Sequence, residues 1–137
     1  MTYRLDPVPA SSVPRLWPVA ARWVSVYNAR HAPRWRFGNA YEKCCDGHAQ
    51  LWLVRSPDSV VGVVITQITT DHERVAEVPV VAGVGLDDWL HLLDELEAWA
   101  RREDCVAMVS TAAREGWVRV LKDRGWEKKA VLMERRL

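Results

Sequence analysis

The segment from residue 51 to residue 70 constrains the fold more than any other part of the sequence. Two runs rich in Val, Ile and Leu, at 51–54 and 60–70, flank a Ser-Pro-Asp-Ser turn at 56–59. Branched apolar residues favour strands, whereas Ser, Pro and Asp favour turns. The pattern predicts a β-hairpin.

A third strand is predicted at residues 75–81, after the polar break at 71–73. Pro79 lies inside this run, and because proline has no backbone N–H it costs a hydrogen bond in a regular central strand. Pro79 therefore predicts a bulge or a locally unpaired edge. Apolar runs at 105–110 and 130–133 predict two more strands, the first of them buried.

Apolar residues at helical spacing predict four helices, at residues 13–29, 37–45, 88–103 and 114–124. The first is expected to begin after Ser11 or Ser12 and to admit Pro14 in its first turn, where a backbone N–H has no partner within the helix. The third has one apolar and one charged face, and Asp87 or Asp88 is expected to cap it. Its apolar face is expected to pack on the sheet.

The composition is that of one folded domain. The chain has 137 residues, 49% hydrophobic and 27% charged, which fits a single domain over residues 1–137. Nineteen basic and eighteen acidic residues give a formal net charge of +1, so no overall field attracts nucleic acid or an anionic membrane. The apolar runs are too short to span a bilayer and the N-terminus lacks a signal-peptide pattern. These features predict a cytoplasmic protein.

The cysteines and histidines predict neither disulfides nor a metal site. There are three cysteines, and Cys44 and Cys45 are adjacent. An odd, small set of this kind is not a disulfide framework. Cys44, Cys45 and His48 come nearest to a ligand cluster, but they lie on one short segment with no second pair of ligands. Cys105 opens a predicted buried strand and is expected to be a core residue, because nothing near it in sequence would lower its pKa.

The chain contains eight tryptophans but only one phenylalanine. Tryptophan combines a large apolar area with one N–H that needs a partner, and it is enriched at interfaces. We expect some of Trp17, Trp23, Trp35 and Trp117 to face another molecule, either a protein partner or a second copy of the chain.

Basic and aromatic residues alternate in one segment, formed by Arg30, His31, Arg34, Trp35 and Arg36. Such a segment could contact a nucleic-acid backbone and stack on its bases, or it could anchor a protein partner. The neutral net charge favours a plain exposed loop over nucleic-acid binding.

The order of predicted elements resembles the GNAT acyltransferase superfamily over nearly the whole chain, most clearly between Val75 and Leu137. Within that superfamily the chain is most similar to the acetyltransferase-like proteins encoded among the structural genes of tailed phages and prophages. Four segments carry the resemblance: 87–90 (Asp-Asp-Trp-Leu), 97–100 (Glu-Ala-Trp-Ala), 116–117 (Gly-Trp) and 121–126 (Leu-Lys-Asp-Arg-Gly-Trp).

The resemblance implies an α+β domain with a twisted, mostly antiparallel sheet of about six strands, flanked by about four helices. It also implies that the strands at 75–81 and 105–110 are parallel and splay apart to admit the arm of acetyl-CoA. The break expected at Pro79 suits that splay.

The resemblance also implies a site, which this sequence supplies only in part. The family cradles the pyrophosphate with a Q/R-x-x-G-x-G/A loop, which places Gly83, Val84 and Gly85 on its G-x-G part. Together with Val81, these are the predicted cofactor-binding residues. Val80 stands where the family has Gln or Arg. Asp87 and Asp88 would place negative charge where the phosphates approach.

The resemblance also implies where the catalytic base and the catalytic acid would lie. Glu77 lies on the strand where many of these enzymes carry a carboxylate, so it is the predicted base, although a solvated strand residue is the plainer interpretation. Leu121 stands where the family often has the tyrosine that protonates the leaving thiolate.

Two hypotheses about function therefore stay open. The first is a non-catalytic structural or assembly component of a phage particle with a degenerate acyl-CoA site, located in the virion or the host cytoplasm. The second is an active acetyl-CoA-dependent N-acetyltransferase that uses Glu77 as its base and acts on an amine of a protein or small molecule.

Overall fold

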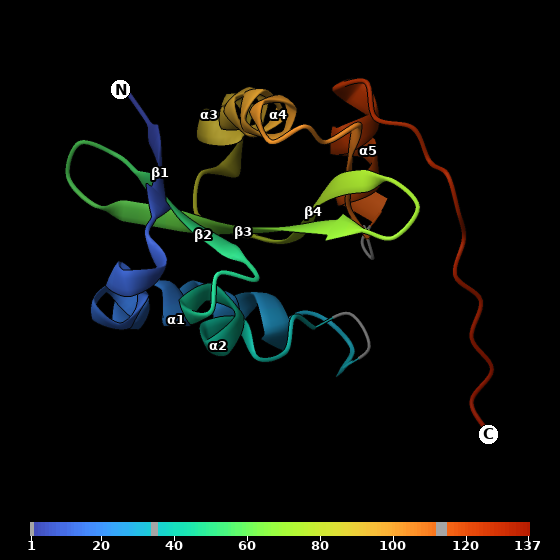
Figure 1. Ribbon diagram of the computed structural model, residues 1–137, viewed down its shortest axis with the longest axis horizontal. Helices are drawn as coiled ribbons and strands as arrows, with labels where there is room; N and C mark the ends of the chain where they lie inside the picture. Colours follow the sequence, from blue (N-terminus) through green and yellow to red (C-terminus); the bar gives the residue numbers. More distant parts are fainter. Residues whose placement is uncertain (1, 34–35, 112–114) are drawn as a thin grey trace.

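The computed structural model describes residues 2–33, 36–111 and 115–137. Within these residues a five-stranded sheet lies between two layers of helices (Figure 1). The strands are β1 (Arg4–Val8), β2 (Gln50–Arg55), β3 (Val60–Thr70), β4 (Arg74–Gly83) and β5 (Ala107–Val109). The helices are α1 (Val13–Ala29), α2 (Ala40–Cys45), α3 (Leu86–Trp89), α4 (Leu93–Arg102) and α5 (Glu115–Asp123), with 3₁₀ turns at Ala10–Ser12 and Leu90–Leu92.

The strands follow one another across the sheet in the order β1-β2-β3-β4-β5. The first three pairings are antiparallel, and β4 and β5 are parallel. The predicted α+β class and the parallel pair are thus confirmed, with a strand count close to the expected six. The β2–β3 hairpin and the turn at 56–59 are also present.

Pro79 produces the predicted bulge. Ile65 pairs with Val80 and Gln67 pairs with Glu77, so two residues of β4 face one residue of β3 at this point. A bulge tolerates a residue that has no N–H to give to the ladder. After the bulge, β4 stays paired with β3 as far as Gly83, whereas its pairing with β5 ends at Glu77.

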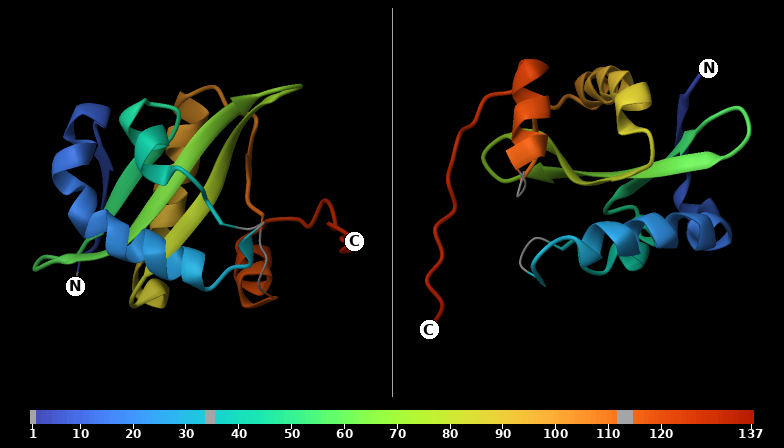
Figure 2. Two further views of the ribbon diagram at one scale, coloured as in Figure 1. Left: turned by 90° about the horizontal axis from the view of Figure 1, so that it is seen from below. Right: turned by 180° about the vertical axis from the view of Figure 1, so that it is seen from behind.

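Each face of the sheet has its own hydrophobic core. On one face, α1 and α2 cover a core that includes Ala20, Trp23 and Leu53. On the other face, α3, α4 and α5 cover a core that includes Trp89 and Leu96. Figure 2 shows the two helical layers on opposite sides of the sheet. Alternating strand residues feed the two cores, as expected for a sheet that is covered on both faces.

One buried polar pair ties β2 to β3. Thr66 is completely buried, and its hydroxyl accepts a hydrogen bond of 2.9 Å from Nε1 of Trp52. Pairing satisfies the only polar group that the tryptophan carries. Among the described residues, no buried side-chain nitrogen or oxygen lacks a hydrogen-bond partner.

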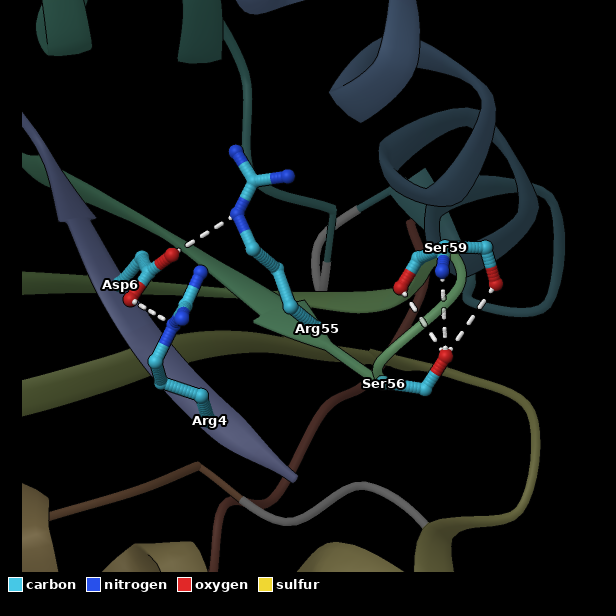
Figure 3. A network of polar contacts seen from close by, with 5 residues as sticks. All are labelled: Arg4, Asp6, Arg55, Ser56 and Ser59. Carbon is cyan, nitrogen blue, oxygen red and sulfur yellow. Dashed lines mark hydrogen bonds and ion pairs between the residues drawn. The ribbon is translucent and has the colours of Figure 1, made fainter. Parts of the chain in front are cut away.

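The N-terminal strand was not predicted from the sequence. β1 contains Pro7 and is followed directly by Pro9, and proline is depleted in strands. Its position at the sheet edge explains why a proline is tolerated there, since the outer side of an edge strand makes no ladder. Asp6 accepts a hydrogen bond of 2.8 Å from Nε of Arg4, and its other carboxylate oxygen forms an ion pair of 2.8 Å with Nε of Arg55, which joins β1 to β2 (Figure 3).

Two predictions for the C-terminal half were wrong. The strand expected at 130–133 is absent, and Val131, Leu132 and Met133 are 66%, 59% and 86% exposed. This short apolar run lies between charged residues and, in the described chain, pairs with no sheet edge. The strand expected at 105–110 is shortened to β5 and is not buried: Ala107 and Val109 are exposed, and Val106, just before the strand, is 67% exposed.

Candidate active site

The parallel strands β4 and β5 stay together for only three residue pairs. Val75 pairs with Ala107, and the last pair joins Glu77 to Val109. Beyond that pair a long hydrogen bond of 3.4 Å joins the Ser110 hydroxyl to the carbonyl oxygen of Val78. The strands therefore separate where the Pro79 bulge begins, which leaves room at the sheet edge.

A cavity of about 410 Å³ lies on one side of this separation. It extends between the outgoing part of β4, the C-terminal end of α1 and α5. Most of its lining is apolar and includes Val26, Val81, Ala82, Trp117 and Val120. Arg30 and His31 give it a basic side. An apolar slot with a few polar groups is the usual form of a small-molecule site.

A second cavity of about 260 Å³ adjoins the first. Tyr27, Val78, Pro79, Ser110 and Thr111 line both cavities. The two spaces thus meet where β4 and β5 part. Such an arrangement can bring two ligands together at one point, each entering from its own side.

Glu77 lines the second cavity but not the first. Its carboxylate accepts a hydrogen bond of 2.8 Å from Nε2 of Gln67 and one of 3.3 Å from the hydroxyl of Thr69. Both donors lie on the neighbouring strand β3. They fix the orientation of the carboxylate at the last residue of β4 that pairs with β5.

The predicted cofactor loop divides into two parts. Val81 and Gly83 line the first cavity, whereas Val84 and Gly85 are not among its lining residues. The N–H of Val84 donates to the carbonyl oxygen of Val61 at 2.9 Å, and the Val84 carbonyl accepts from Nε1 of Trp89 at 2.9 Å. The backbone of Val84 is therefore occupied by internal hydrogen bonds.

Gly83 also has a purely structural requirement. It pairs with Gly62 on β3, and a Cβ added at Gly83 would lie 2.5 Å from the carbonyl oxygen of Val61. The ring of Trp89 packs over both glycines. A glycine at this position is needed for close packing whether or not a phosphate binds nearby.

The predicted capping role of the aspartates was wrong. Helix α3 begins at Leu86 after Gly85, whose φ of 66° is left-handed, and no side chain caps it. Asp87 and Asp88 lie in the first turn instead and are exposed. The helix predicted over 88–103 is also interrupted at Leu90–Leu92 before α4 begins.

The two residues that depart from the family pattern are core residues. Val80 is fully buried, and Leu121 is 6% exposed and packs in the core on the α4 face. Neither lines a cavity. Nothing in the sequence marked Tyr27, Ser110 or Thr111 as site residues, because Tyr27 fits the apolar spacing of a helix and the other two close a strand.

The remaining candidate residues lie elsewhere. Cys44 is buried beneath α1, and burial, with a smaller contribution from Cys45, raises the pKa of its thiol to about 11. Cys105 is half-buried and lines neither cavity. Across residues 2–33, 36–111 and 115–137, no three His, Cys, Asp or Glu side chains gather in a group that could hold a metal ion.

The tryptophans of the described chain all contribute to the two cores. Trp23, Trp52 and Trp89 are buried, and Trp17 and Trp117 are half-buried. Two members of the proposed partner and nucleic-acid surfaces, Arg34 and Trp35, lie outside the described residues. The partner surface stays a prediction. None of the described helices has the length and apolar character needed to cross a membrane.

No protein-family model matches the chain, and no curated protein matches it in sequence. Solved structures do match it. A ribosomal-protein-alanine N-acetyltransferase from Brucella melitensis biovar Abortus superposes with a TM-score of 0.69 at 14% identity, over 99% of this chain and 100% of that chain. AAC(6')-Iy, solved with the bisubstrate analogue CoA-S-monomethyl-acetylneamine, gives 0.69 at 13% identity, over 100% of this chain and 99% of that chain.

A third structure, described as a predicted acetyltransferase of Clostridium acetobutylicum and solved with acetyl-CoA, has a TM-score of 0.69 at 10% identity, over 98% of this chain and 96% of that chain. Identities this low are informative about fold and not about activity. None of these matches bears on the predicted phage origin or on the predicted loss of activity. Together with the sheet order and the parting of β4 from β5, they show that this chain has the fold of the GNAT acetyltransferases.

Proposed function

We propose that the protein is an acetyl-CoA-dependent N-acetyltransferase that acts on an amine of a small molecule or a protein. The observation that carries the proposal is the pair of adjoining cavities at the separation of β4 and β5, with Glu77 in only one of them. One cavity offers an apolar slot and the other a carboxylate. Acyl transfer to an amine needs a space of each kind, meeting at one point.

The first cavity fits the pantetheine arm of an acyl-CoA. Val81, Trp117 and Val120 supply apolar contacts, and the edge of β4 that no longer pairs with β5 beyond the bulge borders the opening. Arg30 is an exposed cation on the same cavity and can offset phosphate charge. Bound there, the group would supply an acyl thioester that is activated towards attack by an amine.

Glu77 is the base in this proposal. An amine in the second cavity gives a proton to the carboxylate, and its nitrogen is then free to attack. Gln67 and Thr69 hold the carboxylate in place, so less ordering is needed when the amine arrives. General base catalysis of this kind typically contributes 10² to 10⁴ in rate, on the order of 3–5 kcal/mol.

A non-catalytic role, such as the predicted structural component of a phage particle, is the second candidate, and the α3 end of the slot favours it. The Val84 N–H is bonded to Val61 and so cannot bind a phosphate, and Asp87 and Asp88 place two carboxylates in the first turn. Each exposed carboxylate would oppose an approaching phosphate by on the order of 1 kcal/mol. This end of the site predicts weak binding of CoA.

A binding titration followed by an activity assay separates the two candidates. The purified protein is titrated with acetyl-CoA to millimolar concentration while tryptophan fluorescence and the melting temperature are measured. Trp117 lines the slot, so saturable quenching and a rising melting temperature are expected. Release of free thiol is then followed with a panel of small amines and peptides. Binding without thiol release favours the non-catalytic role, and absence of binding at millimolar ligand rules out the proposed enzyme.

A further inference from the structure

We propose that the amine acetylated by this protein also carries an anionic oxygen group, a carboxylate or a phosphate, and that the guanidinium of Arg36 binds this group. The inference rests on the proposed acetyltransferase function and narrows its acceptor. Arg36 and Glu77 line the second cavity, and neither lines the first. The acceptor space therefore has one positive and one negative side chain, whereas the rest of its described lining is uncharged.

Contacts with nearby residues of the chain hold Arg36 at the cavity. Its Nε donates a hydrogen bond of 2.9 Å to the carbonyl oxygen of His31, and its backbone N–H donates to the carbonyl oxygen of Pro33 at 3.3 Å. The next residue, Phe37, is buried, lines the same cavity and donates its N–H to Oδ1 of Asn28 on α1 at 3.1 Å. These contacts fix the guanidinium relative to the end of α1.

The charges of Arg36 and Glu77 are not neutralised by protein groups. The hydrogen bonds of the Glu77 carboxylate come from the uncharged side chains of Gln67 and Thr69. In the described parts of the chain neither charged residue forms an ion pair, and the Nη groups of Arg36 make no hydrogen bond. A guanidinium with free Nη groups presents N–H donors in one plane, which match the oxygens of a carboxylate or a phosphate.

A ligand with an amine at one end and an anionic group at the other pairs with both charges of the cavity. Its nitrogen lies at Glu77 and its anionic group at Arg36. A plain alkylamine pairs with Glu77 alone and leaves the guanidinium without a partner. An acceptor with several positive charges meets Arg36 in the second cavity and Arg30 and His31 in the first, so repulsion selects against polyamines.

The contact with Arg36 acts on binding and not on the bonds that change. The nitrogen still loses its proton to Glu77 and bonds to the acyl carbon, and the sulfur leaves with the electron pair of the carbon–sulfur bond. The guanidinium and the anionic group keep their charges throughout, so the contact lowers KM for the acceptor. The second cavity, at about 260 Å³, is small for a ligand site, which favours a compact acceptor of amino-acid size.

The test compares acceptors of equal length with and without the anionic group. β-Alanine and γ-aminobutyrate carry a carboxylate, aminoethylphosphonate carries a phosphonate as a stable stand-in for phosphate, and n-alkylamines of matching length carry neither. Thiol release from saturating acetyl-CoA gives kcat/KM for each amine. With the wild type, the best anionic acceptor is expected to exceed its neutral counterpart about tenfold, through a lower KM. The better of the carboxylate and phosphonate series identifies the anionic group.

Three variants assign the preference to its residue. Arg36→Gln is expected to lower the preference for the anionic acceptor about tenfold, and Arg36→Lys, which keeps the charge but not the planar fork, should retain part of it. Arg30→Gln makes the same change at the first cavity, so it should raise KM for acetyl-CoA and leave the acceptor preference as it is. Each preference is a ratio measured within one protein, so a partial loss of folded protein cancels. Melting temperatures show whether each variant folds.

The outcomes distinguish the inference from the proposed function. If the wild type acetylates alkylamines or a polyamine as well as the anionic acceptors, the inference is wrong and the acetyltransferase proposal stands. A preference for anionic acceptors that survives in Arg36→Gln would also overturn it, because another group would then bind the anion. If no amine of the panel releases thiol, the inference fails, and the titration with acetyl-CoA decides separately whether the proposed function fails with it.

Discussion

The centre of the sheet and its β5 edge differ in how much of their backbone is paired and in how deeply their side chains are buried. In the centre, β3 pairs along nearly its whole length with β2 and β4, and Val63, Val64 and Ile65 are at most 1% exposed. At the edge, β5 pairs through three residues, and Val109 is 41% exposed. In the centre, the backbone N–H and C=O groups are paired in the hydrogen-bond ladder of the sheet. At the β5 edge the ladder ends early, and both cavities lie there.

The difference indicates where stability and function reside in this molecule. Burial of apolar area in the centre contributes most of the favourable free energy of folding. The edge contributes little to the free energy of folding, so β4 can separate from β5 after Glu77 without a large loss of stability. Substitutions in the centre should therefore change stability, and substitutions at the edge should change binding and rate.

The largest effect is expected from Trp89→Ala. Trp89 is 1% exposed, packs over Gly62 and Gly83, and donates to the carbonyl oxygen of Val84. Losing the ring should lower the free energy of unfolding by about 3–5 kcal/mol in a denaturant titration. Trp89→Phe, which keeps much of the apolar area, should lose less. Equal losses in the two variants would show that the hydrogen bond, and not the packing, matters at this position.

Glu77→Gln, in contrast, should lower the rate of acetyl transfer without changing the stability of the fold. Removing the base is expected to lower kcat/KM by 10² to 10⁴ while the melting temperature stays within about 2 °C of the wild type. Glu73→Gln in the exposed β3–β4 turn is the matched control and should leave the rate unchanged. If Glu77→Gln acetylates amines as fast as the wild type, the carboxylate is a solvated strand residue and another group is the base.

The buried thiol of Cys44 predicts that the free energy of unfolding depends on pH. Burial raises the pKa of the Cys44 thiol from 9.0 to about 11, so between these pH values the unfolded chain loses a proton that the folded chain keeps. The free energy of unfolding should therefore fall as pH rises from about 9 to about 11, by up to about 3 kcal/mol.

Cys44→Ala should remove this part of the pH dependence. The measurement is the difference between wild type and variant in urea titrations at pH 8 and pH 11. Other groups that titrate in the same range cancel in that difference. An unchanged difference across the two pH values would mean that the Cys44 thiol ionises equally in both states.

The same substitution in the two regions compares them directly. Val63→Ala, at a fully buried position of β3, should cost about 2 kcal/mol of unfolding free energy. Val106→Ala, beside β5 and 67% exposed, should change it by less than about 0.5 kcal/mol. Comparable costs at the two sites would indicate that the β5 edge is covered in solution.

The smallest effect is expected from removing residues 127–137. Apart from local ion pairs such as Lys129 with Glu127, this stretch makes few contacts, and its apolar residues are exposed. Its removal after Trp126 should change the free energy of unfolding of the monomer by less than about 0.5 kcal/mol. A larger loss, measured at several protein concentrations, would show that the segment packs against the sheet or against a second copy.

Much of the fold was readable from local sequence patterns. The branched apolar runs on either side of residues 56–59 predicted the β2–β3 hairpin, and Pro79 predicted the bulge in β4. These features depend on residues close together in the chain. The errors occurred where long-range pairing decides the outcome: β1 becomes a strand because the β2 edge is available, whereas residues 130–133 have strand-like composition but pair with no strand of the described chain.

The candidate site also has some features that the sequence predicted and others that only the tertiary structure decided. The sequence by itself determined that Glu77 lies on the third strand of the hairpin sheet and that Val80 and Leu121 are apolar. Only the tertiary structure decided that Tyr27, an ordinary apolar-face residue of a helix, shares a cavity with Glu77. The physical reason is that periodicity is set by neighbours within one helix or strand, whereas a cavity is formed by segments that are far apart in the sequence and that sheet order brings together.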